Sequence, residues 1–473
     1  MMQQTGAVTS TGETNGGMST LERWALGIFL VSIALSLYLR FTTAPPTLWG
    51  LLPIVLYALL VLLGIDVVLS TLASLLSAVL LTGIAPKPLA DILAQSLGSF
   101  IAVVGLIIIM GSGLGQVAKE TGAAEYLVRT ILFRIGLRTR TRVQVGVMLT
   151  STILVGALGT LAGANAILAP IVIPIVAAVG FTPPALAAML HAGGAPGLFI
   201  GPFTPPVVTL TGTAKIGYLP YLAAAGVPMA IVTWATGFYM ARWIQRRTEG
   251  TQAYEESDLI KEEHTLGPEA RRGTMAFVLT LLLMLVYGIY IKAGFSYALL
   301  VMMVTSFTTG LAGKLGPVRI LQAIYAGASR LIWLFLLFWL FNPILVLVDQ
   351  TKAYQALVDW GKPFLGMIGA YSFSLIAILI GWVGVSGAAV AQVVLMNQVF
   401  GPIVQQLGIS AAAWVAVLLA SSQLDWFGPF PNADMIGQMG LARSKDLRHQ
   451  LYNGWAIMAM NLVLYLILLR ILV

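Results

Sequence analysis

Residues 191–206 read HAGGAPGLFIGPFTPP, and they lie inside an apolar region that runs from 183 to 213. Proline has no N–H and collides with the preceding turn, while glycine loses the most backbone entropy in a helix, so this run is not expected to remain regular. Irregular backbone at membrane depth is tolerated only where protein covers it or where it lines a cavity. The run therefore predicts a broken helix over 183–213 that helps to enclose a polar site.

The composition around this run is that of a membrane protein. Charged residues make up 9% of the 473 residues and hydrophobic residues 58%, whereas an average soluble domain is about 25% charged. Nearly charge-free blocks occur at 26–39, 51–63, 273–291 and 455–473. A spanning helix needs roughly 20 apolar residues. The sequence predicts an all-α polytopic membrane protein with about 10–12 transmembrane segments.

Two further regions are too long for one helix and too short for two. They are 143–179, with Gly156 and Gly159 near its middle, and 371–402, with Gly381 and Gly384. We expect each to form a re-entrant helical hairpin, and 410–437 to form a second broken helix. The pattern thus predicts one hairpin and one broken helix in each half of the chain.

The chain divides at a charged connector, residues 246–272, which has no apolar periodicity. A Gly/Ser/Thr-rich tail (1–20) is expected to be disordered, and the halves 21–245 and 273–473 have similar content. Gly201-Pro-Phe in the first half is echoed by Gly428-Pro-Phe in the second, and the glycine pairs of the two hairpins repeat at nearly the same offset. Two matches in register indicate an internal repeat.

Loop charges predict how the two halves are oriented. The loop before the first hairpin carries four arginines, whereas the equivalent loop 349–370 has two lysines and two aspartates. After the broken helices the bias reverses: the first half has only Lys215, and the second has Arg443, Lys445 and Arg448. Basic loops face the cytoplasm. We therefore expect inverted repeats in a bacterial inner membrane, with the connector in the cytoplasm. Transporters built on such repeats bind their substrates near the midplane.

Candidate binding residues are the small and polar side chains of the hairpins and broken helices. Small residues let helix ends approach a ligand, and hydroxyl and amide groups add hydrogen bonds. Tight helix packing by small residues is the alternative explanation, and Gln392 could simply bridge helices. The substrate-binding set is Gly159, Thr160, Asn165, His191, Gly193, Gly194, Thr204, Ser386, Gln392, Ser421, Ser422 and Asn432.

Two ionisable residues are candidates for ion coupling. His191 is the only titratable side chain between Arg142 and Lys215, and Asp425 lies beside the second Gly-Pro-Phe motif. An ionisable group inside a membrane is costly and is a functional candidate for that reason. His191 could carry a proton or be a neutral residue bonded to a carbonyl. Asp425 could carry a proton or bind Na⁺, whereas Asp434 is expected nearer the surface.

Several function classes find no support in the sequence. Without cysteine there are no disulfides or thiol chemistry. No Walker A motif, metal-type His/Cys cluster or nucleophile elbow is present, which argues against an ATP-driven pump, an enzyme and a cofactor. The net charge of +8 resides in short loops between spans, as the positive-inside rule expects, and forms no basic face for nucleic acid.

Residues 111–115 (GSGLG), 121–125 (TGAAE), the arginine loop with its hairpin, and the run from His191 to Gly212 resemble the gluconate permease family of the ion transporter superfamily. The chain is also similar to sodium/proton antiporters of that superfamily. The resemblance covers most of 95–240 and, more loosely, 320–470. It implies a homodimer with a scaffold domain and a mobile transport domain, working by an elevator-like motion without ATP.

We therefore expect a secondary active transporter of a small organic anion, gluconate-like or another carboxylate, coupled to H⁺ or Na⁺. The main alternative is a Na⁺/H⁺ antiporter with Asp425 as the shared ion site. A channel would need an open pore, which hairpins occlude, and a membrane enzyme would need a cluster of catalytic groups, which the sequence does not contain.

Overall fold

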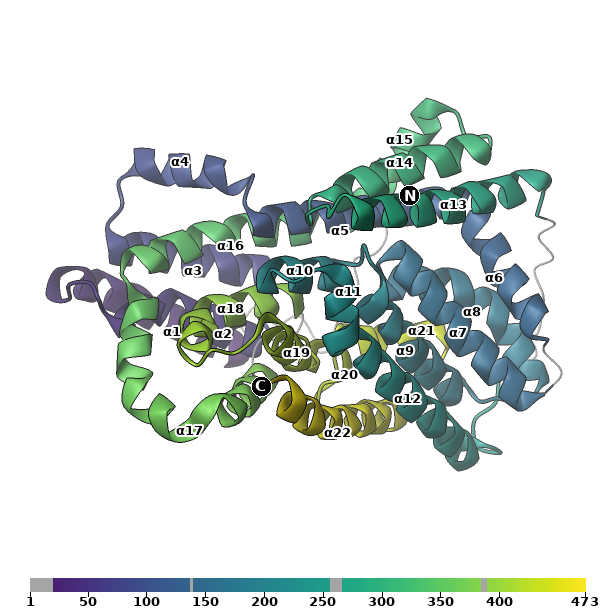
Figure 1. Ribbon diagram of the computed structural model, residues 1–473. Coiled ribbons are helices and arrows are strands. Elements are labelled where there is room, and N and C mark those ends of the chain that lie inside the picture. The colour runs from purple at the N-terminus through teal and green to yellow at the C-terminus, as the bar shows by residue number, and fades with distance from the viewer. Residues whose placement is uncertain (1–19, 137–138, 256–265, 384–388) are drawn as a thin grey trace.

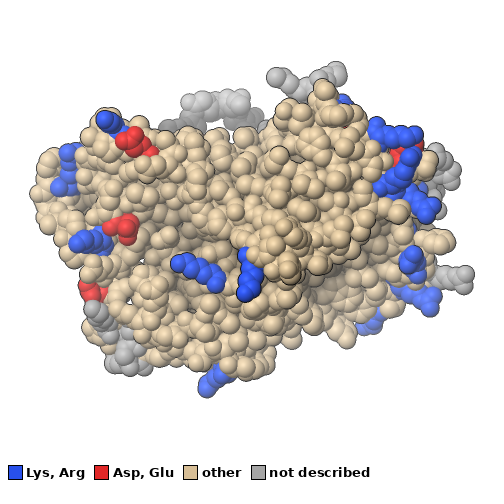
Figure 2. Space-filling view, turned by 45° about the horizontal axis from the view of Figure 1, so that its top comes forward, with Lys and Arg blue, Asp and Glu red and all other residues tan. Residues whose placement is uncertain are grey.

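A computed structural model describes residues 20–136, 139–255, 266–383 and 389–473, and within these ranges every regular element is a helix. Nine helices of this part are long and apolar enough to cross a bilayer. Charged side chains gather mainly toward the left and right ends of the face in Figure 2, and the broad surface between them carries only a few basic ones. The expected all-α polytopic membrane fold is confirmed.

The helices of the first half are α1 (Thr20–Thr42), α2 (Leu52–Leu62), α3 (Val67–Thr82), α4 (Pro86–Ser96), α5 (Phe100–Glu120), α6 (Ala123–Ile135), α7 (Arg140–Leu158), α8 (Leu161–Ala178), α9 (Pro183–Ile200), α10 (Pro205–Ala214), α11 (Tyr218–Tyr221) and α12 (Val227–Thr248). Those of the second half are α13 (Pro268–Tyr290), α14 (Tyr297–Ala312), α15 (Pro317–Ser329), α16 (Ile332–Gln350), α17 (Ala353–Val383), α18 (Ala389–Gln406), α19 (Ala411–Ser421), α20 (Leu424–Phe427), α21 (Ala433–Leu441) and α22 (Leu447–Leu472).

The order of elements repeats between the halves. The series α3–α4–α5, the pair α7/α8, the pair α9/α10 and the long α12 have counterparts in α14–α15–α16, α17/α18, α19/α21 and α22. Equivalent helices begin about 230 residues apart: α5 begins at Phe100 and α16 at Ile332, and α10 begins at Pro205 and α21 at Ala433. The weak sequence repeat thus corresponds to a repeated succession of helices. The opposite orientation of the halves stays a prediction.

The two halves are interleaved. The second limb of the first broken helix, α10, packs against α18 and α19 of the second half. Reciprocally, α21 packs against α8 and α9 of the first half, and Figure 1 shows α21 beside α8 and α9 and α10 beside α18 and α19. Each half therefore completes the surroundings of the other half's hairpin, which places both breaks in one interior.

Three helical segments were not expected from hydropathy. They are α4, α6 and the part of α17 before Gly369, where a φ of 69° interrupts the helix. All precede or follow a long span, and α4, at the upper left of Figure 1, packs on α16, whose Trp339 donates a hydrogen bond to the Leu93 carbonyl at 2.9 Å.

The apolar region 319–348 is divided between α15 and α16 at Leu331, whose φ of −121° is not helical. Close to this break α15 crosses α5, where a Cβ on Gly327 would lie 2.4 Å from the carbonyl oxygen of Ser112.

Local capping explains several helix boundaries. Asp66 accepts hydrogen bonds from the N–H groups of Val68 and Leu69 at 3.0 Å and caps the start of α3. Ser99 and Ser410 cap α5 and α19 in the same manner. Such caps satisfy backbone donors that have no partner in the first turn of a helix.

Candidate functional site

The first hairpin meets the first broken helix at a tight turn. Helix α7 ends at Leu158, Gly159 adopts φ = 72°, and the Thr160 hydroxyl accepts a hydrogen bond from the N–H of Gly163 at the start of α8. A Cβ on Gly159 would lie 3.4 Å from Pro205 Cδ. The predicted hairpin over 143–179 is therefore α7 and α8, and its tip touches the start of α10.

The break in 183–213 is shorter than the sequence indicated. We expected the run from His191 onward to be irregular, but α9 continues to Ile200 and contains Pro196. Only 201–204 interrupt the helix. The buried hydroxyl of Thr204 donates to the carbonyls of Leu198 and Gly201, at 2.7 and 2.9 Å. Carbonyls that lose a helical partner are thus satisfied by a side chain, as membrane depth requires.

Gly193 and Gly194 explain why α9 stays helical. A Cβ on Gly193 would lie 2.7 Å from the Cα of Met148, and one on Gly194 would lie 2.3 Å from Leu161. Thr152 of α7 donates a hydrogen bond to the Gly193 carbonyl at 2.6 Å. Neighbouring helices therefore support the glycine-rich part of α9. In this conformation the two glycines serve close packing of α7 and α8 on α9.

Asn165 of α8 is the centre of a buried hydrogen-bond network. Its Oδ1 accepts from the Ser151 hydroxyl at 2.7 Å, and its Nδ2 donates to the Leu190 carbonyl at 3.0 Å and to Gln438 Oε1 at 2.7 Å. Asn165 and Gln438 have no exposed surface. One amide thus connects both limbs of the first hairpin, α9 and α21, so the network bridges the two halves of the chain.

His191 forms a second buried connection between the halves. Its Nε2 lies 2.8 Å from the Trp426 carbonyl oxygen, which can only accept, so Nε2 carries the proton. Its Nδ1 lies 2.9 Å from Gln450 Nε2 on α22 and accepts from it. The ring is fully buried and 5.1 Å from the Phe427 ring. These contacts describe a neutral imidazole held in one tautomer.

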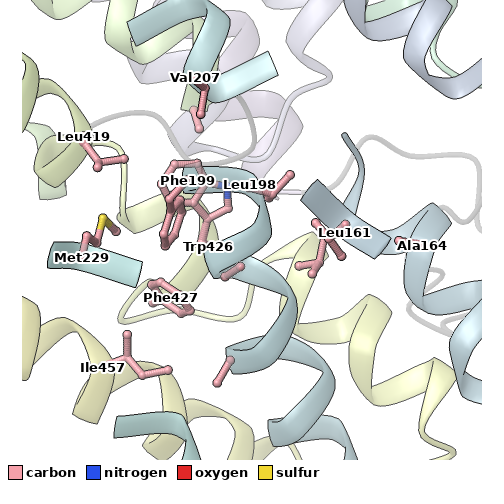
Figure 3. Packing of buried hydrophobic residues seen from close by; sticks show 14 of the residues in the cluster. Leu161, Ala164, Leu198, Phe199, Val207, Met229, Leu419, Trp426, Phe427 and Ile457 are labelled. Carbon is pink, nitrogen blue, oxygen red and sulfur yellow. The ribbon is translucent and has the colours of Figure 1, made fainter. Parts of the chain in front are cut away.

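Aromatic side chains pack where the two broken helices come together. Figure 3 shows Phe199, Trp426 and Phe427 between α9 and the second broken helix, and the ring centroids of Phe199 and Trp426 are 4.8 Å apart. Trp426 and Phe427 are buried. The Trp426 carbonyl also accepts from the Asn432 amide at 3.2 Å. The ring packing and this hydrogen bond together hold the carbonyl to which His191 donates.

The second hairpin repeats one feature of the first. Gln392 of α18 donates to the Ser421 carbonyl at 2.9 Å and to the Gly381 carbonyl at 2.6 Å. Asn165 makes the equivalent contact to Leu190 in the first half. In both halves, an amide on the second limb of the hairpin holds a carbonyl on the first limb of the broken helix. Gln392 therefore bridges helices in the structure, as the alternative interpretation of this residue expected.

Asp425 lies beside the start of the second hairpin's α18. Its Oδ2 accepts from the N–H of Ala389 at 2.9 Å. A carboxylate at a helix N-terminus is stabilised by unpaired N–H groups and by the helix dipole. Asp434 occupies the first turn of α21 and is partly buried, not a surface residue. Ser386 lies outside the described residues.

The remaining second-half candidates engage their own backbone. Ser421 and Ser422 are buried, and their hydroxyls donate to the carbonyls of Leu418 and Leu419, at 2.9 Å each. Asn432 caps α21 by accepting from the N–H of Met435 at 2.8 Å. These side chains therefore line the second broken helix while bonding locally.

Sequence reasoning missed three residues that the structure brings into the site: Ser151, Gln438 and Gln450. Gln450 Oε1 and Gln438 Nε2 are buried and have no hydrogen-bond partner among the described residues. A polar amide within an apolar helix is the available signal, because such groups in membranes usually bond across helices. Within the described ranges, no group of three or more His, Cys, Asp or Glu is arranged to hold a metal ion.

An all-helical fold with several spans, two hairpins and two broken helices that meet through buried amides defines the class: a multi-pass membrane transporter. Residues 95–425 match the sequence model of the family described as C4-dicarboxylate anaerobic carrier, and the chain belongs to that family. The match does not single out the gluconate permease family that the motifs resemble.

The fold is similar to the crystal structure of the YdaH transporter of Alcanivorax borkumensis, described as having an unusual topology. The likeness has a TM-score of 0.58 at 14% identity and covers 96% of this chain and 98% of that one. No curated protein matches the sequence. At this identity the likeness concerns the fold alone.

Proposed function

We propose that this chain is a cation-coupled secondary carrier of C4-dicarboxylates. The observation that carries the proposal is the meeting of the two halves at Asn165 and His191, combined with membership of the C4-dicarboxylate carrier family. A carrier must bind its substrate between elements that rearrange, and these contacts join a hairpin (through Asn165) and a broken helix (through His191) of the first half to the broken helix of the second. Gluconate-like substrates are the less supported form of the proposal.

Substrate recognition would use helix ends and polar side chains. The N-terminus of α8 with Thr160 lies against the break at Gly201–Thr204, and α18 begins beside Asp425. A helix N-terminus carries unpaired N–H groups and a partial positive charge, both favourable to a carboxylate. Asp425 already accepts from the Ala389 N–H at the start of α18, so a substrate carboxylate would bind at this terminus together with the proton or cation that Asp425 takes up.

Coupling would use His191 or Asp425, because both are ionisable, His191 contacts the second half's broken region at Trp426, and Asp425 lies within that region. Protonation of His191 at Nδ1 would place an N–H opposite the Gln450 amide nitrogen. That amide would then have to turn its Oε1 toward the ring. Asp425, already at a helix N-terminus, would instead take up H⁺ or Na⁺ together with neighbouring carbonyls.

The transport motion is proposed to be elevator-like, in a homodimer within the inner membrane, with 246–272 cytoplasmic. The interleaving of α10 with α18 and α19, and of α21 with α8 and α9, supports movement of the hairpins and broken helices as one body. That body would carry the substrate past the surrounding scaffold helices.

The test is uptake of labelled succinate, fumarate and gluconate into proteoliposomes under an imposed pH or Na⁺ gradient. We expect dicarboxylate uptake that depends on one of the gradients, and a loss of that dependence in either His191→Gln or Asp425→Asn. Uptake of none of these solutes under any gradient would refute the proposal.

The alternative is a Na⁺/H⁺ antiporter, favoured only by the position of Asp425 at the start of α18. It predicts Na⁺-dependent proton movement in vesicles that contain no organic solute, and loss of this exchange in Asp425→Asn. Exchange that requires a dicarboxylate would exclude the antiporter.

A further inference from the structure

A cavity of about 550 Å³ lies beside the first broken helix, between the loop that follows α10 and the loop that joins α13 to α14. Pro202 and Phe203 of the break line it, as do Lys215 and Lys292. The two lysines are exposed, whereas Pro202 and Phe203 are half-buried. The cavity thus extends from a surface that carries two cations to the backbone of the candidate site.

Lys215 and Lys292 both lie near helix ends, and these ends are the ones remote from the connector. Helix α12 ends at Thr248, within the first residues of the connector, and its chain segment begins near Lys215; α13 starts at Pro268, within the last residues of the connector, and ends beside Lys292. Each helix is long enough to cross a bilayer. The cavity therefore opens on the side of the molecule opposite the connector.

The floor of the cavity adjoins the first hairpin. A Cβ on Gly159 would lie 3.9 Å from the Phe203 carbonyl oxygen, and Phe203 packs against both large hydrophobic clusters of the molecule. The wall is tied to α9 because the Tyr218 hydroxyl donates to the Ile200 carbonyl. Phe203 thus separates the open cavity from the tip at Gly159 and Thr160.

The charge of the cavity is one-sided. Of its lining residues, the two lysines are the only charged ones, and neither forms a salt bridge with another residue of the described ranges. Both lysines also have a simpler structural role, because each follows the C-terminus of a helix, where a cation complements the helix dipole. All five non-glycine residues with positive φ in the described part are basic. Lys352 has the same positive φ of 53° but does not line the cavity. Lining the cavity is therefore a property of Lys215 and Lys292 that the helix-end position alone does not explain.

We propose that this cavity is an access vestibule in which Lys215 and Lys292 attract the dianionic substrate before it passes Phe203 to reach the first hairpin. The inference rests on the proposed dicarboxylate transport. The cavity is large compared with a C4 dianion, so the anion would remain partly hydrated in it and would not be tightly enclosed by protein. Cations around a low-dielectric depression raise the local concentration of an anion and speed its arrival, and salt screens the effect.

The experiment compares initial succinate uptake into proteoliposomes of the Lys215→Gln/Lys292→Gln double variant and of wild type, at low ionic strength and with added choline chloride. We expect a KM raised three- to tenfold at low salt with kcat unchanged, and a smaller difference at high salt. Lys352→Gln is the matched control and should leave KM unchanged. The charge-retaining Lys215→Arg/Lys292→Arg variant should restore KM, and it separates loss of charge from misfolding.

Two further arms identify the anion. One arm measures inhibition of labelled succinate uptake by unlabelled succinate and by succinamate, a monoanion of the same length. The inhibition constants of wild type and of the Gln double variant should differ less for succinamate than for succinate. Vesicles of neutral phosphatidylcholine and vesicles containing phosphatidylglycerol should give the same KM effect. An effect confined to the anionic lipid would mean that the lysines hold lipid phosphate, and would overturn the vestibule.

An unchanged KM in the Gln double variant, or an equal rise in Lys352→Gln, would also overturn it. Wild-type protein that takes up no dicarboxylate would instead refute the proposed function, and with it the substrate assigned to the cavity. The two failures are therefore distinguishable.

Discussion

Asn165 on α8 donates a hydrogen bond to Gln438 on α21 at 2.7 Å, joining residues 273 positions apart in the sequence. It is a direct polar contact between the first hairpin and the second broken helix. We expect Asn165→Ala and Gln438→Ala each to lower stability by about 1–3 kcal/mol, because each leaves a buried polar partner unsatisfied.

The double variant tests whether the contact itself is responsible. A coupling energy of about 1 kcal/mol from thermal unfolding in detergent is expected for groups in direct contact. Strictly additive losses would show that the two amides act independently and that the halves are held together by other packing.

His191 and Gln450 offer a test of proton coupling. In Gln450→Glu a carboxylate would face Nδ1 and favour the protonated ring, so the pH of half-maximal uptake should move upward by about one unit. The measurement is the pH profile of uptake, and His191→Gln/Gln450→Glu should lack the shift. An unmoved profile in Gln450→Glu would leave Asp425 as the remaining coupling candidate.

Gly193 should tolerate no side chain. An added Cβ would meet backbone atoms of Met148 at 2.7 and 2.9 Å, which cannot move without separating α7 from α9. Overpacking of this kind costs about 1–3 kcal/mol. Gly193→Ala should therefore lower the unfolding midpoint and the uptake rate.

The matched control is Gly437 in α21, around which an added Cβ would meet no atom within 4 Å. Gly437→Ala should be neutral or slightly stabilising, since alanine favours a helix by about 0.5–1 kcal/mol over glycine. Equal effects of the two alanines would mean that the contact of α7 with α9 is looser than described.

Asp446 gives a pH dependence outside the spans. Partial burial would raise the pKa of Asp446, but hydrogen bonds from the His449 N–H, the Gln252 amide and the His449 ring outweigh it and hold the pKa below its ordinary value. A lowered pKa means that the stability from ionised Asp446 is present above about pH 4 and is lost as pH falls through the folded-state pKa.

Asp446→Asn keeps the helix cap but removes the charge, so it should lower the unfolding midpoint by roughly 1–2 °C at pH 7. The difference from wild type should shrink as the pH falls below 4. Asp91→Asn, at an exposed position on α4, serves as the control. A difference that persists unchanged at pH 3 would contradict the account.

Much of the fold follows from the order of residues alone. Lipid offers no water to bond with free amides, so long apolar runs become helices and glycine–proline clusters interrupt them. For this reason the segments 143–179, 183–213 and 410–437 could be predicted, and Asp425 stood out as a charge in an apolar region. Amphipathic helices such as α4 and α6 were missed because their apolar residues are spaced along one face and do not form a run.

Which residues meet was decided by tertiary structure. Nothing local to α21 or α22 indicates that Gln438 faces Asn165 or that Gln450 faces His191, because each contact needs α21 and α22 to cross the first half. The continuity of α9 through Gly193 and Pro196 likewise depends on α7 and α8 packing closely enough to support it. Sequence determines where the backbone can break, since that is a property of single residues; the partners of buried polar groups are a property of the assembled fold.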